Sequence, residues 1–189
     1  MTAKAFKTST GLEEGVRVLY CDLDGTIRKG FDELGKFVNK AEDVELFEGV
    51  AEKLKIYKDA GWRIVGITNQ GGVSLGHLSF KDMKESILET DKQCGLIFDK
   101  ILACIHHPEA KDLEFAICWC RKPRIGLIVE AAIAMGREYD EFYPPHLALF
   151  VGDRDEDREC AKNAGIKFMD AKEWRNEDTL ASLAQDEER

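Results

Sequence analysis

Apolar residues occur in short runs separated by polar, glycine-containing segments. The runs at 16–21 and 62–68 are rich in β-branched side chains and contain few charges, which is typical of strands buried on both faces. Shorter runs of the same character predict further strands at 98–105, 147–151 and 166–169. The pattern therefore predicts several buried strands of similar length.

Between these strands, apolar residues recur at helical spacing. Val50, Leu54 and Tyr57 share one face of a predicted helix. Ser79, followed three positions later by Asp82, resembles a capping box at the start of another helix, with Asp in place of the usual Glu or Gln. The helices are predicted over 48–59, 79–94, 125–135 and 155–163. The segments 22–39 and 106–121 lack such spacing and are predicted to be irregular.

Strands that alternate with helices predict an α/β fold, in which a Rossmann-like parallel sheet has helices on both faces. A chain of 189 residues is suited to one such domain, which we place at 15–175. Residues 1–14 are predicted to be a flexible N-terminus, and 176–189 an acidic C-terminal tail. Ligands of open parallel sheets bind beyond the carboxyl ends of the strands. Catalytic and ligand-binding residues are therefore expected immediately after each strand.

The charge balance narrows the classes of partner. With 27 Lys and Arg against 36 Asp and Glu, the net charge of −9 disfavours tight, non-specific nucleic-acid binding. No apolar run approaches the roughly 18–20 residues that a membrane helix needs, and the N-terminus lacks the apolar block of a signal peptide. We therefore expect a cytoplasmic protein with no membrane partner and reduced cysteines. The oligomeric state stays open, with a monomer favoured.

A pair of aspartates follows the first predicted strand. Asp22 and Asp24 are separated by one residue, and like charges this close repel unless a cation or a shared proton intervenes. A hard cation such as Mg²⁺ suits an all-oxygen site. The pair is typical either of a nucleophile with an acid/base partner and a metal, or of an Asp-rich turn that caps a strand.

Polar groups after the other strands favour the chemical interpretation. Thr68 offers a hydroxyl at the end of the second strand, and Asn69, Gln70 and Gly71 offer backbone N–H groups in a glycine-rich turn that suits phosphate oxygens. Lys122 offers a positive charge ahead of a predicted helix. Asp153 and Asp157 follow the fourth strand. The ordered set predicts a phosphate site.

This arrangement resembles the haloacid dehalogenase (HAD) superfamily of phosphohydrolases. The matching motifs are DLDGT at 22–26, ITN at 67–69, Lys122, and GDRDED at 152–157. The resemblance implies a phosphatase in which Asp22 is the nucleophile and forms an aspartyl-phosphate. It further implies that Asp24 protonates the leaving group and then activates water.

The resemblance also assigns roles to the remaining site residues. It implies that Thr68 and Lys122 hold the transferring phosphoryl group. It implies that Mg²⁺ is bound by Asp153, the Asp22 carboxylate and the Asp24 backbone carbonyl, with Asp157 as a supporting carboxylate. The 17 residues between Thr26 and Val44 are too few for a separate cap domain. We therefore expect a capless enzyme with an open cleft.

A cluster of cysteine and histidine residues lies in the irregular insert at 104–121. Cys104-x-His106 and Cys118-x-Cys120 together offer three thiolates and an imidazole, the closed tetrahedral set of a structural Zn²⁺ site. Coincidental buried cysteines are the alternative. His107 could replace His106, but Cys-x-His mirrors Cys-x-Cys and favours His106. The insert is thus predicted to be a small zinc-binding loop.

The spacing of this cluster resembles the zinc-containing group of the superfamily that includes heptose 1,7-bisphosphate phosphatases and histidinol-phosphatase domains. The resemblance implies that Arg121 and Lys122 contact substrate, and it extends to TNQGG at 68–72. Leu23 departs from the arginine that this group usually has there, and the segment containing Arg28 departs from the heptose pattern. Both departures leave the substrate open.

Three functions are therefore considered. The favoured one is hydrolysis of a small phosphorylated substrate, a sugar phosphate or bisphosphate. The second is a nucleic-acid 3′-phosphatase of the polynucleotide kinase-phosphatase type, which the acidic charge disfavours. The third is a non-catalytic zinc-binding interaction module, which the complete set of candidate catalytic residues disfavours.

Overall fold

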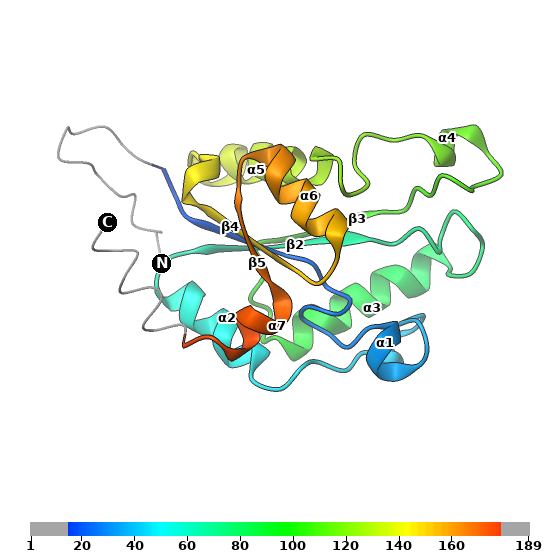
Figure 1. The fold of residues 1–189 in the computed structure, drawn as a ribbon, viewed down its shortest axis with the longest axis horizontal. Helices are drawn as coiled ribbons and strands as arrows, with labels where there is room; N and C mark the ends of the chain where they lie inside the picture. The colour runs from blue at the N-terminus through cyan, green and yellow to red at the C-terminus, as the bar shows by residue number, and fades with distance from the viewer. Residues whose placement is uncertain (1–14, 179–189) are drawn as a thin grey trace.

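A single five-stranded parallel sheet forms the centre of the computed structural model, which describes residues 15–178 (Figure 1). The strand order is β3-β2-β1-β4-β5. The bounds are β1 Val18–Cys21, β2 Arg63–Asn69, β3 Lys100–Cys104, β4 Ala148–Gly152 and β5 Lys167–Asp170. The expectations for 1–14 and for the tail after 178 lie outside the described residues.

Helices cover both faces of the sheet. The α-helices are α1 Phe31–Leu34, α2 Val50–Asp59, α3 Phe80–Gln93, α4 Leu113–Ala116, α5 Gly126–Tyr139, α6 Asp155–Ala164 and α7 Ala171–Asn176. Two 3-10 helices, η1 Ala41–Asp43 and η2 Pro145–Leu147, complete the elements of residues 15–178. In Figure 1, α5 and α6 lie above the sheet, whereas α2, α3 and α7 lie below it. The Rossmann-like α/β prediction is confirmed.

Strand β1 is buried on both faces of the sheet, which explains why its sequence is apolar throughout. Leu19 and Cys21 belong to the core beneath α2 and α7, whereas Val18 and Tyr20 belong to the core beneath α5 and α6. All four side chains are buried. A strand covered on both faces has no solvent-facing positions, so it reads as a continuous apolar run.

Four helices differ from the expectation. The short helices α1 and α4 lie in segments that were predicted to be irregular, because a single helical turn leaves no periodicity in the sequence. Helix α5 continues through Gly136 to Tyr139, and the left-handed residue Asp140, with φ of 54°, follows its end. Helix α7 was not predicted. The Asp170 side chain caps it, and Trp174 is fully buried from it. A helix of six residues depends on such packing more than on its own periodicity.

The carboxyl ends of β2 and β3 lie on the right in Figure 1, toward α4 and the loop between β2 and α3. The order of the sheet reverses at β1, which pairs with β2 on one side and β4 on the other. The segment between β1 and α2 contains α1 and η1 and no separate cap domain, as expected. Among residues 15–178, no helix has the length and apolar character that crossing a bilayer requires.

Candidate active site

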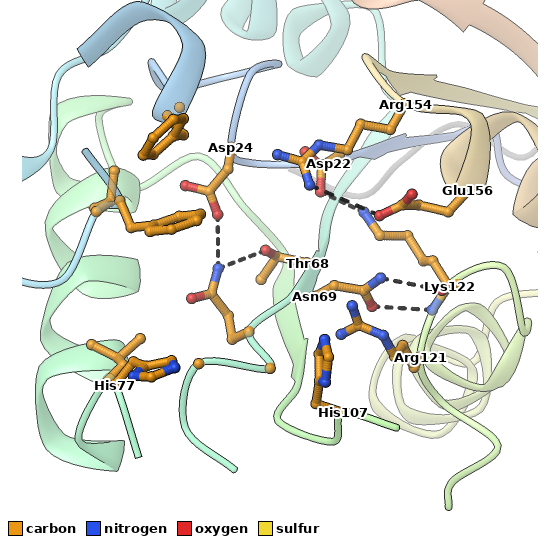
Figure 2. Close-up of a pocket in the computed structure, with 18 of the residues that line it drawn as sticks. Asp22, Asp24, Thr68, Asn69, His77, His107, Arg121, Lys122, Arg154 and Glu156 are labelled. Atoms are coloured by element: carbon orange, nitrogen blue, oxygen red, sulfur yellow. Dashed lines mark hydrogen bonds and ion pairs between the residues drawn. The ribbon is translucent and has the colours of Figure 1, made fainter. Parts of the chain in front are cut away.

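A cleft of about 560 Å³ lies at this edge of the sheet. Asp22 directly follows β1 and continues its ladder, because its N–H donates to the Val151 carbonyl at 2.9 Å. Thr68 and Asn69 come from the end of β2, and Lys122 reaches in ahead of α5. Figure 2 shows these side chains around a common space. The sheet therefore brings together groups that are far apart in the sequence.

Lys122 is the centre of a buried charge network. Its Nζ forms ion pairs with Asp22 and, at 2.7 Å, with Asp157, and it donates to the Ile67 carbonyl at 2.9 Å. All three charged residues are at most 6% exposed. The Asn69 side chain accepts from the Lys122 backbone N–H at 3.0 Å and donates to its carbonyl at 3.2 Å. In this structure the amide of Asn69 thus fixes the backbone that carries the lysine.

Burial and neighbouring charges control ionisation in this network. Burial raises the pKa of Asp22 well above its ordinary value; Asp157 and Asp24 raise it further, and Lys122 opposes them. Burial acts to lower the pKa of Lys122, but Asp22 and Asp157 outweigh burial and raise it above its ordinary value. Lys122 is therefore firmly cationic. Its single positive charge is not enough to offset the burial and mutual repulsion of the neighbouring carboxylates.

A second cation would supply that charge. Asp22, Asp153 and Asp157 each offer a carboxylate oxygen, and these oxygens all lie within 4.8 Å of one another. Within residues 15–178, buried Oδ1 of Asp153 has no hydrogen-bond partner. Burial and then the Asp157 charge raise the pKa of Asp153 to about 6. An all-oxygen set with an unpaired buried oxygen fits a hard divalent cation.

The backbone at Gly25 is adapted to this acidic cluster. Gly25 has a φ of +88°, and a Cβ added there would lie 2.2 Å from Oδ2 of Asp153. Any other residue would be strained and would collide with that carboxylate. The glycine of the DLDGT motif therefore permits the close approach of the first loop to Asp153.

Asp24 lies in a separate hydrogen-bond network on the other side of the cleft. Gln70 Nε2 donates to Asp24 Oδ2 at 2.8 Å and to Thr68 Oγ1 at 2.9 Å. Arg28 forms an ion pair with Asp24, with 2.7 Å between Nε and Oδ1. No role for Arg28 was predicted from the sequence. Its place four residues after Asp24 is the signal that could have indicated one.

The four predicted zinc ligands converge. Cys104 Sγ lies 3.8 Å from Cys118 Sγ, 3.2 Å from Cys120 Sγ and 3.5 Å from His106 Nδ1. Ligands on a tetrahedral Zn²⁺ with bonds of about 2.0–2.3 Å are separated by roughly 3.5–3.8 Å. His107 instead lines the cleft. The structure thus gathers Cys104, His106, Cys118 and Cys120 as a group that could hold a metal ion.

The walls of the cleft include residues that sequence reasoning missed. Arg154 and His107 join Arg121 in Figure 2 on the side near Lys122. The apolar side chains Phe31 and Phe37 line the cleft from the segment after the DLDGT motif. Irregular segments carry no periodicity, so which of their side chains turn inward could not be predicted from the sequence.

Comparison with known proteins identifies the family. Residues 17–174 match the family model described as polynucleotide kinase 3 phosphatase. The chain belongs to this family of HAD-type phosphatases. It is 31% identical over 157 residues to a heptose-1,7-bisphosphate 7-phosphatase from Haemophilus ducreyi, covering 81% of each chain. It is 30% identical over 177 residues to the corresponding protein from Chlorobaculum tepidum, covering 91% of this chain and 86% of that one.

Solved structures of this family share the fold. A heptose 1,7-bisphosphate phosphatase from B. bronchiseptica matches with a TM-score of 0.66 and 23% identity, covering 81% of this chain and 79% of that one. A HAD-like protein from Mesorhizobium loti matches with a TM-score of 0.72 and 23% identity, covering 90% of this chain and 87% of that one. The family match and the relatives of 30–31% identity confirm the expectation of a HAD-superfamily phosphatase, and these structures show the shared fold.

Proposed function

We propose that this phosphatase hydrolyses a small sugar phosphate or bisphosphate through an aspartyl-phosphate on Asp22, with Mg²⁺ as cofactor. The observation that supports it best is the buried pairing of Lys122 with Asp22 and Asp157 beside the partnerless oxygen of Asp153. A nucleophilic carboxylate, a fixed cation and an oxygen-rich cation site then meet in one cleft.

The chemistry divides into two displacements. In the first, an Asp22 carboxylate oxygen bonds to phosphorus while the bond from phosphorus to the leaving oxygen breaks, and Asp24 gives that oxygen a proton. In the second, water bonds to phosphorus, Asp24 accepts its proton, and the acyl-phosphate bond breaks to release phosphate and free Asp22. Lys122 and Thr68 contact phosphoryl oxygens in both.

The acidic cluster would hold the metal. Asp22 and Asp153 would be carboxylate ligands, the Asp24 backbone carbonyl would be a third, and Asp157 would support them. Bound Mg²⁺ would offset the negative charge of the phosphoryl group beside the buried carboxylates. Lys122, which precedes α5, supplies the remaining positive charge.

The two walls of the cleft suit a phosphorylated sugar. Arg121 and Arg154 could pair with a second phosphate. Phe31 and Phe37 are 46% and 64% exposed, and their rings lie 4.8 Å apart, so they offer apolar area to the C–H face of a sugar. The relatives named as heptose bisphosphate phosphatases support the same substrate class.

A panel of phosphate esters tests this function. We expect Mg²⁺-dependent phosphate release from small sugar phosphates and bisphosphates, and much slower release from a 3′-phosphorylated oligonucleotide. Chelated samples provide the control. Preference for the oligonucleotide would support the nucleic-acid 3′-phosphatase instead, and absence of release from every ester would support the interaction module.

Substitutions at Asp24 and Asp153 separate acid/base chemistry from metal binding. Asp24→Asn is expected to lose catalysis yet keep Mg²⁺ binding, because its metal contact would be a backbone carbonyl. Asp153→Asn is expected to raise the Mg²⁺ concentration needed for half-maximal activity. Magnesium titrations of both variants check this. If rising Mg²⁺ rescues Asp24→Asn and not Asp153→Asn, the two roles are reversed.

We further propose that Cys104, His106, Cys118 and Cys120 bind one structural Zn²⁺. Protein atoms would fill all four positions and leave none for a reacting water. The insert exposes Leu113, 78%, and Ile117, 73%, so apolar burial contributes little to its folding. Metal binding would supply that free energy and orient the adjacent Arg121 and Lys122.

Replacing Cys118 with Ser is expected to lower zinc content and thermal stability together. Cys94→Ser is the matched control, because Cys94 is a buried cysteine outside the metal group. Metal analysis and thermal unfolding measure both effects. Zinc absent from wild-type protein purified without chelators, or a disulfide between any two of the three ligand cysteines in freshly reduced protein, would contradict the assignment.

A further inference from the structure

We propose that Arg28 is a positioning residue that fixes the Asp24 carboxylate in the cleft and anchors it to helix α3. This inference rests on the proposed function, because it concerns the residue that would serve as acid and base. Asp24 belongs to the loop after β1, whereas the anchor belongs to a helix more than fifty residues later in the chain.

The guanidinium of Arg28 is shared between these two elements. Its Nε donates to Asp24 Oδ1 at 2.7 Å and its Nη2 to Asp24 Oδ2 at 3.3 Å, which is a two-pronged contact. Its Nη1 donates to the Ser86 carbonyl at 3.2 Å and to Thr90 Oγ1 at 2.9 Å. One edge of the planar guanidinium therefore binds the Asp24 carboxylate, and its other nitrogen is bound by acceptors on α3.

The backbone of the loop directs the arginine back onto its own aspartate. The Arg28 N–H donates to the Leu23 carbonyl at 2.9 Å, and the Gly25 N–H donates to the Arg28 carbonyl at 2.8 Å. These bonds close residues 23–28 into a tight turn. Asp24 and Arg28 then lie side by side at its base.

Burial makes this contact more than a surface ion pair. Arg28 is 0% exposed, and a buried guanidinium is costly unless its donors are satisfied. The Asp24 side chain is 26% exposed, so the pair joins a fully buried cation to a carboxylate that reaches the cleft. Gln70 adds a third donor to Asp24. Both carboxylate oxygens are thus fixed by groups that cannot move without disturbing α3 or β2.

Fixing Asp24 matters because its two tasks are directional. It would give a proton to the leaving oxygen and later take one from the attacking water, and a displacement of about 1 Å can cost roughly 10²-fold in rate. Without Arg28, the side chain could turn among its staggered rotamers. Arg28 itself contacts neither phosphorus nor metal in this scheme and acts through Asp24.

An aryl phosphate distinguishes positioning from a purely structural role. A phenolate leaves without help from an acid, so formation of the aspartyl-phosphate tolerates a misplaced Asp24, whereas its hydrolysis still needs Asp24 as base. Arg28→Gln is expected to lower kcat at least about tenfold and KM in proportion, because kcat/KM reports phosphoenzyme formation and should stay within about twofold. It is also expected to accumulate phosphoenzyme in acid-quenched steady-state samples. Arg28→Lys, which keeps the charge but not the fork, is expected to recover part of the rate.

Two further variants keep the test informative. Thr90→Val removes one anchor and leaves the ion pair, so it is expected to shift phosphoenzyme in the same direction by less, even if Arg28→Gln folds poorly. Arg63→Gln is the control, because Arg63 pairs with Glu141 and Asp99, outside the residues that line the cleft. It is expected to lose stability and keep the wild-type phosphoenzyme fraction.

The outcomes separate this inference from the proposed function. If Arg28→Gln, Arg28→Lys and Thr90→Val lose turnover only in proportion to folded protein, with an unchanged phosphoenzyme fraction, Arg28 is structural and the inference is wrong. If wild-type protein hydrolyses the ester without phosphorylated Asp22, the proposed mechanism is wrong.

Discussion

Asp22→Asn is expected to lower kcat at least about 10³-fold, because a neutral amide is a poor nucleophile and also a poorer metal ligand. Phosphate release under saturating sugar phosphate and Mg²⁺ measures the loss. Asp59→Asn is a suitable control, since Asp59 is an exposed carboxylate on α2 that pairs with Lys55. Near-normal turnover by Asp22→Asn would refute the nucleophile assignment.

The same substitution is expected to leave the fold intact or to stabilise it. Burial raises the pKa of Asp22, so its charged form opposes folding at neutral pH when no cation is bound. Lys122 keeps Asp157 as a partner. An inactive variant that unfolds at or above the wild-type temperature in chelator would therefore separate a chemical defect from a folding defect.

Lys122→Met is expected to lose both activity and stability. It removes the ammonium that lies between the buried carboxylates of Asp22 and Asp157 and leaves them unpaired, a change that typically costs about 3–5 kcal/mol. It also removes a cation that would stabilise the phosphoryl group, which is expected to lower kcat by about 10²-fold or more. Urea unfolding in chelator and steady-state kinetics measure the two effects.

Lys53→Met provides the matched control. Lys53 is also a buried lysine, but it donates to the carbonyls of Trp174 and Glu177 and does not line the cleft. It is expected to lose stability and retain the kcat of its folded fraction. Asp157→Asn in the Lys122→Met background is expected to recover stability and not activity. Wild-type kcat in Lys122→Met would contradict the role of this lysine.

The position of the site could be predicted because its residues follow strands. A parallel sheet places all the carboxyl ends of its strands at one edge, so Asp22, Thr68 and Asp153 meet once the strands are recognised. The Cys and His group could also be predicted from the sequence, because two closely spaced pairs of ligands need only one loop to bring them together.

The remaining features depend on contacts between distant segments. Arg28 lies in a turn without periodicity. Its proposed role depends on contacts with Ser86 and Thr90, which lie on a helix distant in the sequence. Helix α7 is short and forms around the buried Trp174. The order of the strands was not predicted, because alternation of strands and helices is compatible with several sheet orders.

Trapping the covalent intermediate tests the mechanism most directly. Wild-type protein mixed with an aryl phosphate and Mg²⁺ is quenched in acid within one turnover, and its intact mass and peptides are measured. We expect one phosphoryl group per chain, on the peptide containing Asp22, and none in Asp22→Asn or in chelator. Rapid turnover with no phosphorylated protein, or with the phosphoryl group on another residue, would contradict the proposed mechanism.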